Sequence, residues 1–361
     1  MQIESPFTVL ALNGGGIRGL YTAVLLRDLC ALLAKETGKD GTDIGRNFHL
    51  ITGTSTGGIL GCGLAAGVPT NRIVELYEQK GPLIFADPMP VDRGGKIRWG
   101  IRNRNKAANS PEPLKQALVE IFGNRTLAEI YADREIALCI PASRMLDEKP
   151  KVFKTPHLKR YGVDGGVSVV DVCLATSAAP IFLPLHQINC GDDGGRAFAD
   201  GGLWANNPTL VGLLEALEIC HRAEGPDERK RPIEILSLGT CSVPVGDPPH
   251  VALDRGIVAW QLGVKTTSLA MNTQSAGTDY MSRLLAQRIT ELGRNVTIVR
   301  IDDPRVSQEQ AAHLQLDLAT PEAIQLLKQL GSSRAQAVLS DASDPRHQDG
   351  QFIKRILTQH P

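Results

Sequence analysis

Three short motifs carry residues that could do chemistry, and each follows a strand-like apolar run. Residues 13–19 read Asn-Gly-Gly-Gly-Ile-Arg-Gly, and residues 53–57 read Gly-Thr-Ser-Thr-Gly, a G-x-S-x-G pattern. Far downstream, residues 200–202 read Asp-Gly-Gly. The first motif could hold an anion on backbone amides, the second could expose a nucleophilic serine, and the third could supply a carboxylate base. Together they would suffice to hydrolyse an ester through an acyl-enzyme.

The G-x-S-x-G pattern predicts Ser55 as the nucleophile. This serine lies between a strand-like run at residues 49–51 and an apolar, helix-like run at residues 58–66. In that context the serine occupies a sharp turn whose neighbours must be small, and its hydroxyl lies at a helix N-terminus that favours developing negative charge. The competing interpretation is a Ser/Thr-rich turn that only caps the helix.

The glycine loop has three competing interpretations. Gly14, Gly16 and Gly19 satisfy G-x-G-x-x-G, but a dinucleotide site also needs an acidic residue at the end of the second strand, where this chain has Gly-Thr-Ser. A plain tight turn is the second interpretation. The third, which we favour, is an oxyanion site in which the amides of Gly15 and Gly16 face the substrate. Arg18 would then stabilise the loop or a nearby phosphate.

None of the three motifs contains a histidine. A conventional Ser-acid-His triad would place its histidine after Asp200, but the histidines there do not lie in strand-end turns, and we expect them to be solvated. They are His221, His250, His313, His347 and His360. A carboxylate within hydrogen-bond reach of the serine can take its proton directly. We therefore predict Asp200 as the base of a Ser-Asp dyad, with an ordinary Asp-Gly turn as the alternative.

The elements that would position these motifs alternate between strand-like and helix-like runs. Further strands are predicted at residues 136–140, 167–170 and 233–238, and helices at residues 20–29, 70–77, 113–122 and 208–221. This alternation predicts an α/β fold with a mostly parallel central sheet flanked by helices. Because adjacent parallel strands end at the same edge of a sheet, the glycine loop and the serine should converge there.

Composition excludes several classes of protein. The 361 residues include 39 basic and 39 acidic side chains, so no overall charge draws the chain to a nucleic-acid polymer. No apolar run approaches the roughly 18 to 20 residues of a membrane span, and no segment resembling a signal peptide precedes the first strand. The seven cysteines are scattered without C-x-x-C or Cys/His spacing. We expect reduced cysteines, no metal, no cofactor and a cytoplasmic location.

Two stretches stand apart from the alternating pattern. Residues 81–112 are rich in glycine and proline, and a connection of that length is usually a functional lid or disordered. It holds a basic segment around Trp99 that could bind lipid phosphates, a nucleotide or only solvent: Arg93, Lys96, Arg98, Arg102, Arg104 and Lys106. Residues 246–361 are predicted to form a helical C-terminal extension packed on the catalytic domain of residues 1–245.

The three motifs, in this order, resemble those of the patatin-like phospholipase family. Other stretches that resemble the family lie at residues 81–85, 175–180, 206–208 and 237–240, so the resemblance covers roughly residues 6–245. One departure is Cys241, which stands where another small turn residue commonly follows Gly239 and Thr240. We expect this departure to change local packing without loss of activity.

The resemblance implies a Ser-Asp dyad that hydrolyses acyl esters of glycerophospholipids. By this resemblance Ser55 is the nucleophile and Asp200 is its base. The residues that would bind the oxyanion are Gly15 and Gly16, with help from Gly14 and Arg18. A catalytically silent lipid- or nucleotide-binding module is disfavoured because both members of the dyad are intact.

Two biological roles remain open at this point. A patatin domain with a helical extension resembles a constitutive lipid acyl hydrolase, and it also resembles the cyclic-nucleotide-activated effectors of bacterial antiviral defence. Chain length and the basic segment favour the effector. The partners implied are membrane phospholipid, bound transiently at the inner face of the membrane, a cyclic dinucleotide activator, and a second copy of the chain in a homo-oligomer.

Overall fold

The fold is built around one mixed β-sheet. The computed structural model describes residues 5–38, 43–189, 195–242, 253–256, 260 and 264–358. Its strands are β1 (Phe7–Leu12), β2 (Leu50–Gly53), β3 (Ala137–Arg144), β4 (Lys149–Lys154), β5 (His186–Ile188), β6 (Arg196–Asp200), β7 (Ile233–Leu238) and β8 (Val296–Ile301). They form an eight-stranded sheet in the order β5-β6-β3-β2-β1-β7-β8, with β4 also paired to β3.

The centre of the sheet is parallel, as the sequence predicts. The neighbouring pairs from β3 through β2, β1 and β7 to β8 are all parallel, whereas β4, β5 and β6 join in antiparallel pairs. All six residues of β1 are buried. Alternate side chains enter two different cores, with Leu10 and Leu12 in one and Val9 and Ala11 in the other. A strand buried on both faces is typical of a parallel sheet covered by helices on both sides.

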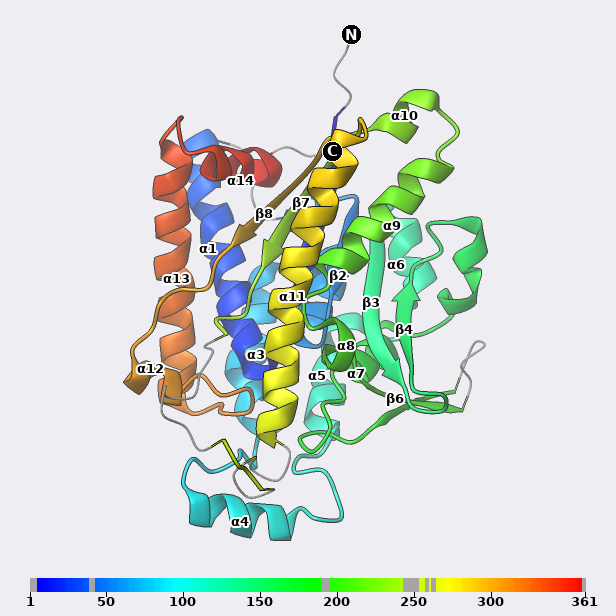
Figure 1. Ribbon diagram of the computed structural model, residues 1–361. Helices are drawn as coiled ribbons and strands as arrows, with labels where there is room; N and C mark the ends of the chain where they lie inside the picture. Colours follow the sequence, from blue (N-terminus) through cyan, green and yellow to red (C-terminus); the bar gives the residue numbers. More distant parts are fainter. Residues whose placement is uncertain are drawn as a thin grey trace.

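Helices cover both faces of the sheet (Figure 1). The helices of eight residues or more are α1 (Gly19–Thr37), α2 (Thr56–Ala65), α3 (Thr70–Ile84), α4 (Arg93–Arg102), α5 (Glu112–Phe122), α6 (Leu127–Arg134), α7 (Val169–Thr176), α9 (Thr209–Arg222), α11 (Val264–Glu291), α13 (Pro321–Ser343) and α14 (Gln348–Thr358). Shorter helices are α8 (Gly202–Ala205), α10 (Pro226–Lys230) and α12 (Gln308–Ala312). Among the described helices, none is both long and apolar enough to cross a bilayer.

The C-terminal part of the chain is mostly helical, but it also contributes a strand. β8 pairs in parallel with β7 along its whole length and closes one edge of the sheet. α13 packs along α1 (Figure 1), and residues of α13 and α14 belong to the same hydrophobic core as α1. The boundary expected at residue 245 lies outside the described residues, so the division into two parts stays a prediction.

One local prediction needs correction, and the long connection contains a helix that was not predicted. Residues 167–170 were expected to form a strand, but α7 begins at Val169, where the Ser168 hydroxyl accepts a hydrogen bond from the amide of Asp171 at 3.0 Å. That side-chain cap favours the helix over the β-propensity of the valines. The connection at residues 81–112 contains α4, which Asp92 caps in the same way through the amide of Gly95 at 2.7 Å.

Candidate active site

The site lies where strand ends meet. β1 and β2 are in register with Leu12 opposite Gly53, so the glycine loop and the serine turn leave the sheet side by side. β6 runs antiparallel to β3 with Asp200 opposite Ala142, and β6 lies two strands from β2 and three from β1. The three motifs therefore reach one place from strands of both directions.

Ser55 occupies a strained turn between β2 and α2. Its φ of 55° and ψ of −124° are rare for a residue with a side chain. The backbone amide of Ser55 donates to the hydroxyl of Thr176 at 2.9 Å, and that hydroxyl donates to the carbonyl of Pro141 at 2.6 Å. At Gly57, a Cβ would lie 2.4 Å from the carbonyl oxygen of Leu12, so the turn admits only glycine there. The surroundings thus hold the serine in its strained geometry.

Ser55 and Asp200 lie in direct contact. The Ser55 hydroxyl donates to Oδ2 of Asp200 at 2.8 Å, although the two residues are 145 positions apart. The amide of Gly202 donates to the other carboxylate oxygen, Oδ1, at 2.6 Å. Both side chains are buried. This arrangement orients one carboxylate oxygen toward the serine proton while the backbone holds the other.

No described histidine lines the pocket that holds these two residues. His221 and His347 are exposed and His313 is half-buried. His250 and His360 lie outside the described residues. Among the described residues, the side chain that accepts the Ser55 hydroxyl is the carboxylate of Asp200, and the Ser-Asp dyad stays a prediction.

Burial raises the pKa of the Asp200 carboxyl. Removal from water raises the pKa of Asp200 to about 6, although the hydrogen bonds from Gly202 and Ser55 lower it in part. A pKa of this size suits a general base near neutral pH, since the carboxylate is ionised yet retains proton affinity.

The pKa of Asp200 leads to a prediction about pH. We expect kcat/KM for a soluble ester to fall about tenfold per pH unit below an apparent pKa near 6, because the base must be deprotonated to accept the serine proton. The measurement is a pH–rate profile from pH 4.5 to 8, with circular dichroism at each pH to confirm folding. An acid limb near pH 4 in folded protein would contradict this assignment of the base.

The glycine loop presents two amides to the pocket. The amide of Gly14 donates to the carbonyl of Asn206 at 3.0 Å and is therefore occupied. Gly15 and Gly16 both line the pocket, and among the described residues neither amide has a hydrogen-bond acceptor. These two donors are available to an anionic group in the pocket, and their role as the oxyanion site stays a prediction.

Arg18 contacts the glycine loop outside the lining of the pocket. Its buried guanidinium donates to the carbonyl of Gly15 at 3.3 Å and approaches the carbonyl of Leu314 at 3.5 Å. Arg18 is not among the residues that line the described pocket. Its position fits the stabilisation of the loop, one of the two roles left open by the sequence, and not a direct contact with substrate.

Gly16 allows a second part of the chain to approach the loop. Its φ is +58°, and a Cβ there would lie 2.1 Å from the carbonyl oxygen of Leu316, which accepts the amide of Ile17 at 2.9 Å. We expect Gly16→Ala to lower the free energy of unfolding by about 3 kcal/mol. Gly123→Ala is the matched control, because Gly123 has the same φ but nothing within 4 Å of a Cβ; it should lose only about 1 kcal/mol. Equal losses in urea unfolding would contradict the close approach.

Sequence reasoning missed several supporting residues. Thr176 and Thr240 lie in stretches noted only for their family resemblance, yet Thr176 holds the Ser55 amide and the hydroxyl of Thr240 donates to the carbonyl of Gly14 at 2.9 Å. From α11, Gln274 accepts the amide of Asn206 at 3.0 Å, and no motif pointed to it. A helix-like pattern reveals a buried face but not which loop that face contacts.

The pocket beside the dyad is strongly apolar. Apart from Ser55, Asp200 and the glycine loop, its walls come from helices α2, α3, α5, α8 and α11, from Phe85 just after α3, and from the loops at residues 177–183 and 316–317. The apolar residues of these walls include Ile59, Leu76, Tyr77, Ile84, Phe85, Leu114, Phe182, Leu183, Met271 and Leu316. Such walls match a hydrocarbon chain in preference to a sugar or a phosphate.

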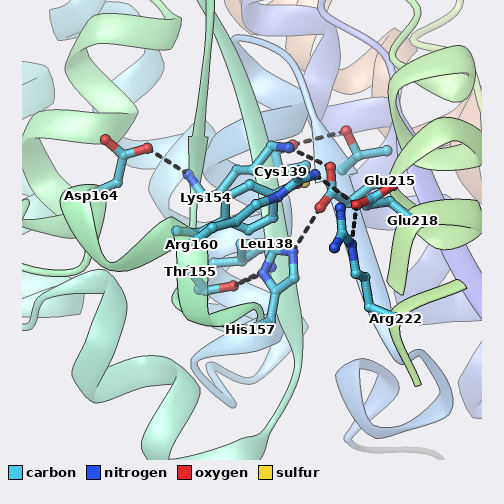
Figure 2. Close-up of polar contacts among 12 residues, drawn as sticks. Leu138, Cys139, Lys154, Thr155, His157, Arg160, Asp164, Glu215, Glu218 and Arg222 are labelled. Carbon is cyan, nitrogen blue, oxygen red and sulfur yellow. Dashed lines mark hydrogen bonds and ion pairs between the residues drawn. The ribbon is translucent and has the colours of Figure 1, made fainter. Parts of the chain in front are cut away.

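A separate cluster contains potential metal ligands but is explained by hydrogen bonds (Figure 2). Ligand atoms of Cys139, His157 and Glu215 lie within 4.8 Å of one another. However, His157 bonds to Glu215 at 3.0 Å through Nε2 and to Thr155 at 2.8 Å through Nδ1, and the Lys154 ammonium pairs with Glu215. Burial raises the pKa of Glu215, but the hydrogen bonds from His157 and Lys154 outweigh it and bring the pKa to about 2. The network ties β4 to α9.

An α/β sheet with a strained serine elbow beside an apolar pocket is the architecture of a serine hydrolase acting on apolar substrates. Comparison with known proteins makes this class more specific. The family model described as patatin-like phospholipase matches residues 10–213. The chain belongs to the patatin-like phospholipase family and is a hydrolase.

Three relatives are similar over most of their length. The cGAMP-activated phospholipase of Vibrio cholerae is 30% identical, covering 92% of this chain and 92% of the relative. The cGAMP-activated phospholipase of Pseudomonas aeruginosa is 32% identical over 93% of this chain and 90% of the relative. The cUMP-AMP-activated phospholipase of Escherichia coli is 28% identical over 85% of this chain and 84% of the relative. The similarity thus includes the C-terminal part, beyond the segment matched by the family model.

Proposed function

We propose that this protein cleaves fatty-acyl esters of glycerophospholipids through an acyl-enzyme on Ser55. The observation that supports this most is the 2.8 Å hydrogen bond from the Ser55 hydroxyl to Asp200 at an apolar pocket. A phospholipid acyl chain would occupy that pocket, which places its ester carbonyl at the serine.

In the proposed reaction, Ser55 attacks the ester carbonyl as its proton moves to Oδ2 of Asp200. The amides of Gly15 and Gly16 would stabilise the oxyanion, while Asp200 would pass its proton to the departing lysophospholipid oxygen. Asp200 would then take a proton from water as the water attacks the acyl-enzyme, and would return that proton to the departing Ser55 oxygen, which releases the fatty acid and regenerates both residues. Gly14 and Arg18 would act by holding the loop. No step requires a metal or an organic cofactor.

We further propose that a cyclic dinucleotide switches the enzyme on, as part of bacterial antiviral defence. This proposal is supported by relatives whose names record activation by cGAMP or cUMP-AMP and that align with most of this chain. The enzyme would work in the cytoplasm and meet the inner face of the membrane transiently. Assembly into a homo-oligomer stays a prediction. A constitutive lipid acyl hydrolase is the alternative.

The test is phospholipid hydrolysis by wild type beside Ser55→Ala, with and without cGAMP, cUMP-AMP and cyclic di-AMP. Fatty-acid release that needs both Ser55 and one nucleotide supports the whole proposal. Equal release without any nucleotide supports the constitutive alternative. Release by Ser55→Ala at the wild-type rate would overturn the assignment of the nucleophile.

A further inference from the structure

One side of α4 is fixed beside the pocket. The indole of Trp99 is buried, donates to the carbonyl of Asp87 at 3.2 Å and lies 6.2 Å from the ring of Phe182 between ring centres. Phe182 lines the pocket that holds the dyad. The amides of Ala108 and Asn109 also donate to the carbonyls of residues 181 and 182, at 2.9 and 3.0 Å. The helix therefore has a defined position next to the pocket.

The other side of α4 is apolar and exposed. Ile97 and Ile101, one helical turn apart, are 50% and 56% exposed, and Val91 just before the helix is 65% exposed. Transfer of branched aliphatic side chains out of water is favourable, by about 25 cal/mol for each Å² of apolar surface that is buried. None of the three belongs to either hydrophobic core of the described residues.

Positive charge surrounds these aliphatic side chains. Residues 93–106 contain six basic residues and no acidic residue. Arg102 is paired with Asp87, whereas Arg98 and Lys106 have no ion pair among the described residues. A run of this charge, mixed with aliphatic side chains, is complementary to an anionic lipid surface.

α4 lies at one end of the molecule and contacts the lining of the pocket through Trp99 and Phe182. Figure 1 shows α4 at the end of the molecule opposite α10 and α14. Further exposed apolar side chains belong to elements around the pocket: Leu83 at 58%, Ile181 at 41%, Leu203 at 44% and Leu269 at 48%. Ile181 and Leu203 also line the pocket itself, so the apolar surface is continuous with the catalytic site.

We propose that this α4 face (Val91, Ile97, Arg98, Ile101, Arg104 and Lys106, with Ile181 and Leu203) docks on the surface of a bilayer that contains anionic phospholipid. The inference rests on the proposed function, because an acyl chain must pass from a bilayer into the pocket. Ile97 and Ile101 enter the boundary between headgroups and acyl chains, and the basic side chains bind lipid phosphates. A protein partner would need no such continuity with an acyl-binding pocket, so the membrane is the occupant that the observations favour.

The test measures binding separately from hydrolysis. Protein carrying Ser55→Ala is floated with vesicles of phosphatidylethanolamine and phosphatidylglycerol, with and without cGAMP. We expect Ile97→Ser with Ile101→Ser to weaken binding by about tenfold or more. The matched control is Leu214→Ser with Leu292→Ser, whose side chains are 53% and 87% exposed. Leu214 is in α9 and Leu292 follows the end of α11 that lies away from α4 (Figure 1); this control should bind like the parent.

A second variant tests how much the basic side chains contribute to vesicle binding. Arg98→Gln with Arg104→Gln should weaken binding about tenfold at low salt and reduce its salt dependence, since each basic residue near an anionic surface contributes about 1 kcal/mol. Binding to vesicles of phosphatidylcholine alone should be weak for all proteins. Unchanged binding of both α4 variants to anionic vesicles would overturn the proposed face, and so would absence of binding by the parent in every condition.

A second readout separates this inference from the proposed function. In the Ser55 background, hydrolysis of p-nitrophenyl butyrate needs no membrane, so both α4 variants should retain the parent rate within about twofold. Loss of this soluble activity in the variants would indicate damage to the site and would overturn a role confined to docking. No esterase activity of the protein with Ser55, with or without cGAMP, cUMP-AMP and cyclic di-AMP, together with intact vesicle binding, would instead reject the proposed function and keep the docking face.

Discussion

Ser55→Ala is expected to lower the rate of phospholipid hydrolysis by about 10⁴-fold or more while the protein stays folded. The expectation follows because no other described hydroxyl donates to the carboxylate of Asp200; the Ser143 hydroxyl donates to the backbone carbonyl of Asp200 instead. The base therefore has no second nucleophile to activate. Replacing the nucleophile of a serine hydrolase removes most of the chemical step. The measurement is fatty-acid release under activating conditions, with the circular dichroism spectrum as the check on folding.

Ser55→Gly is the matched variant for the strain at this position. Alanine keeps a side chain at a φ of 55° and ψ of −124°, whereas glycine adopts such angles without steric conflict. Both variants should be inactive, but Ser55→Gly should be more stable than Ser55→Ala by about 1 kcal/mol in urea unfolding. A less stable glycine variant would show that the surrounding contacts, and not the strain, dominate the energetics of the turn.

Asp200→Asn should abolish hydrolysis and raise stability at the same time. The amide cannot accept the Ser55 proton, so we expect a loss of about 10³-fold or more. Burial raises the pKa of Asp200 to about 6. The folded protein is therefore favoured by protonation of Asp200, and that stability is lost as pH rises through about 6. At pH 7 the uncharged asparagine should gain about 2 kcal/mol in the free energy of unfolding.

The pH dependence of that gain is the decisive feature. The advantage of Asp200→Asn over wild type should shrink as pH falls from 7 toward 4, because the wild-type carboxyl then becomes neutral as well. Asp317→Asn is the matched control, since burial raises the pKa of Asp317 also to about 6 but its carboxylate accepts the amide of Met89 and does not contact Ser55. It should gain stability and keep activity within about tenfold. A destabilised Asp200→Asn at pH 7 would show that the carboxylate serves the fold.

The motifs that follow the carboxyl ends of β1 and β2 were predictable from the sequence alone. Apolar runs that lead into glycine-rich turns specify β1 and β2, and adjacent parallel strands bring those turns to one edge. The glycine loop and the serine elbow therefore follow from local pattern. The sequence did not reveal α4 or the true start of α7, because the caps that begin those helices, Asp92 and Ser168, are single side chains within stretches of weak periodicity.

By itself, then, the sequence determined the types of groups at the site and the strands that carry two of them. Tertiary structure decided which of these groups touch. Asp200 reaches Ser55 because β6 pairs antiparallel with β3, a long-range choice that no local pattern encodes. Likewise, the amide of Gly14 donates to the carbonyl of Asn206, so the amides of Gly15 and Gly16 are the donors left in the loop. Arg18 contacts the carbonyls of Gly15 and Leu314. Hydrogen-bond partners between distant segments are set by packing, whereas strand ends and turns are set by local residue type.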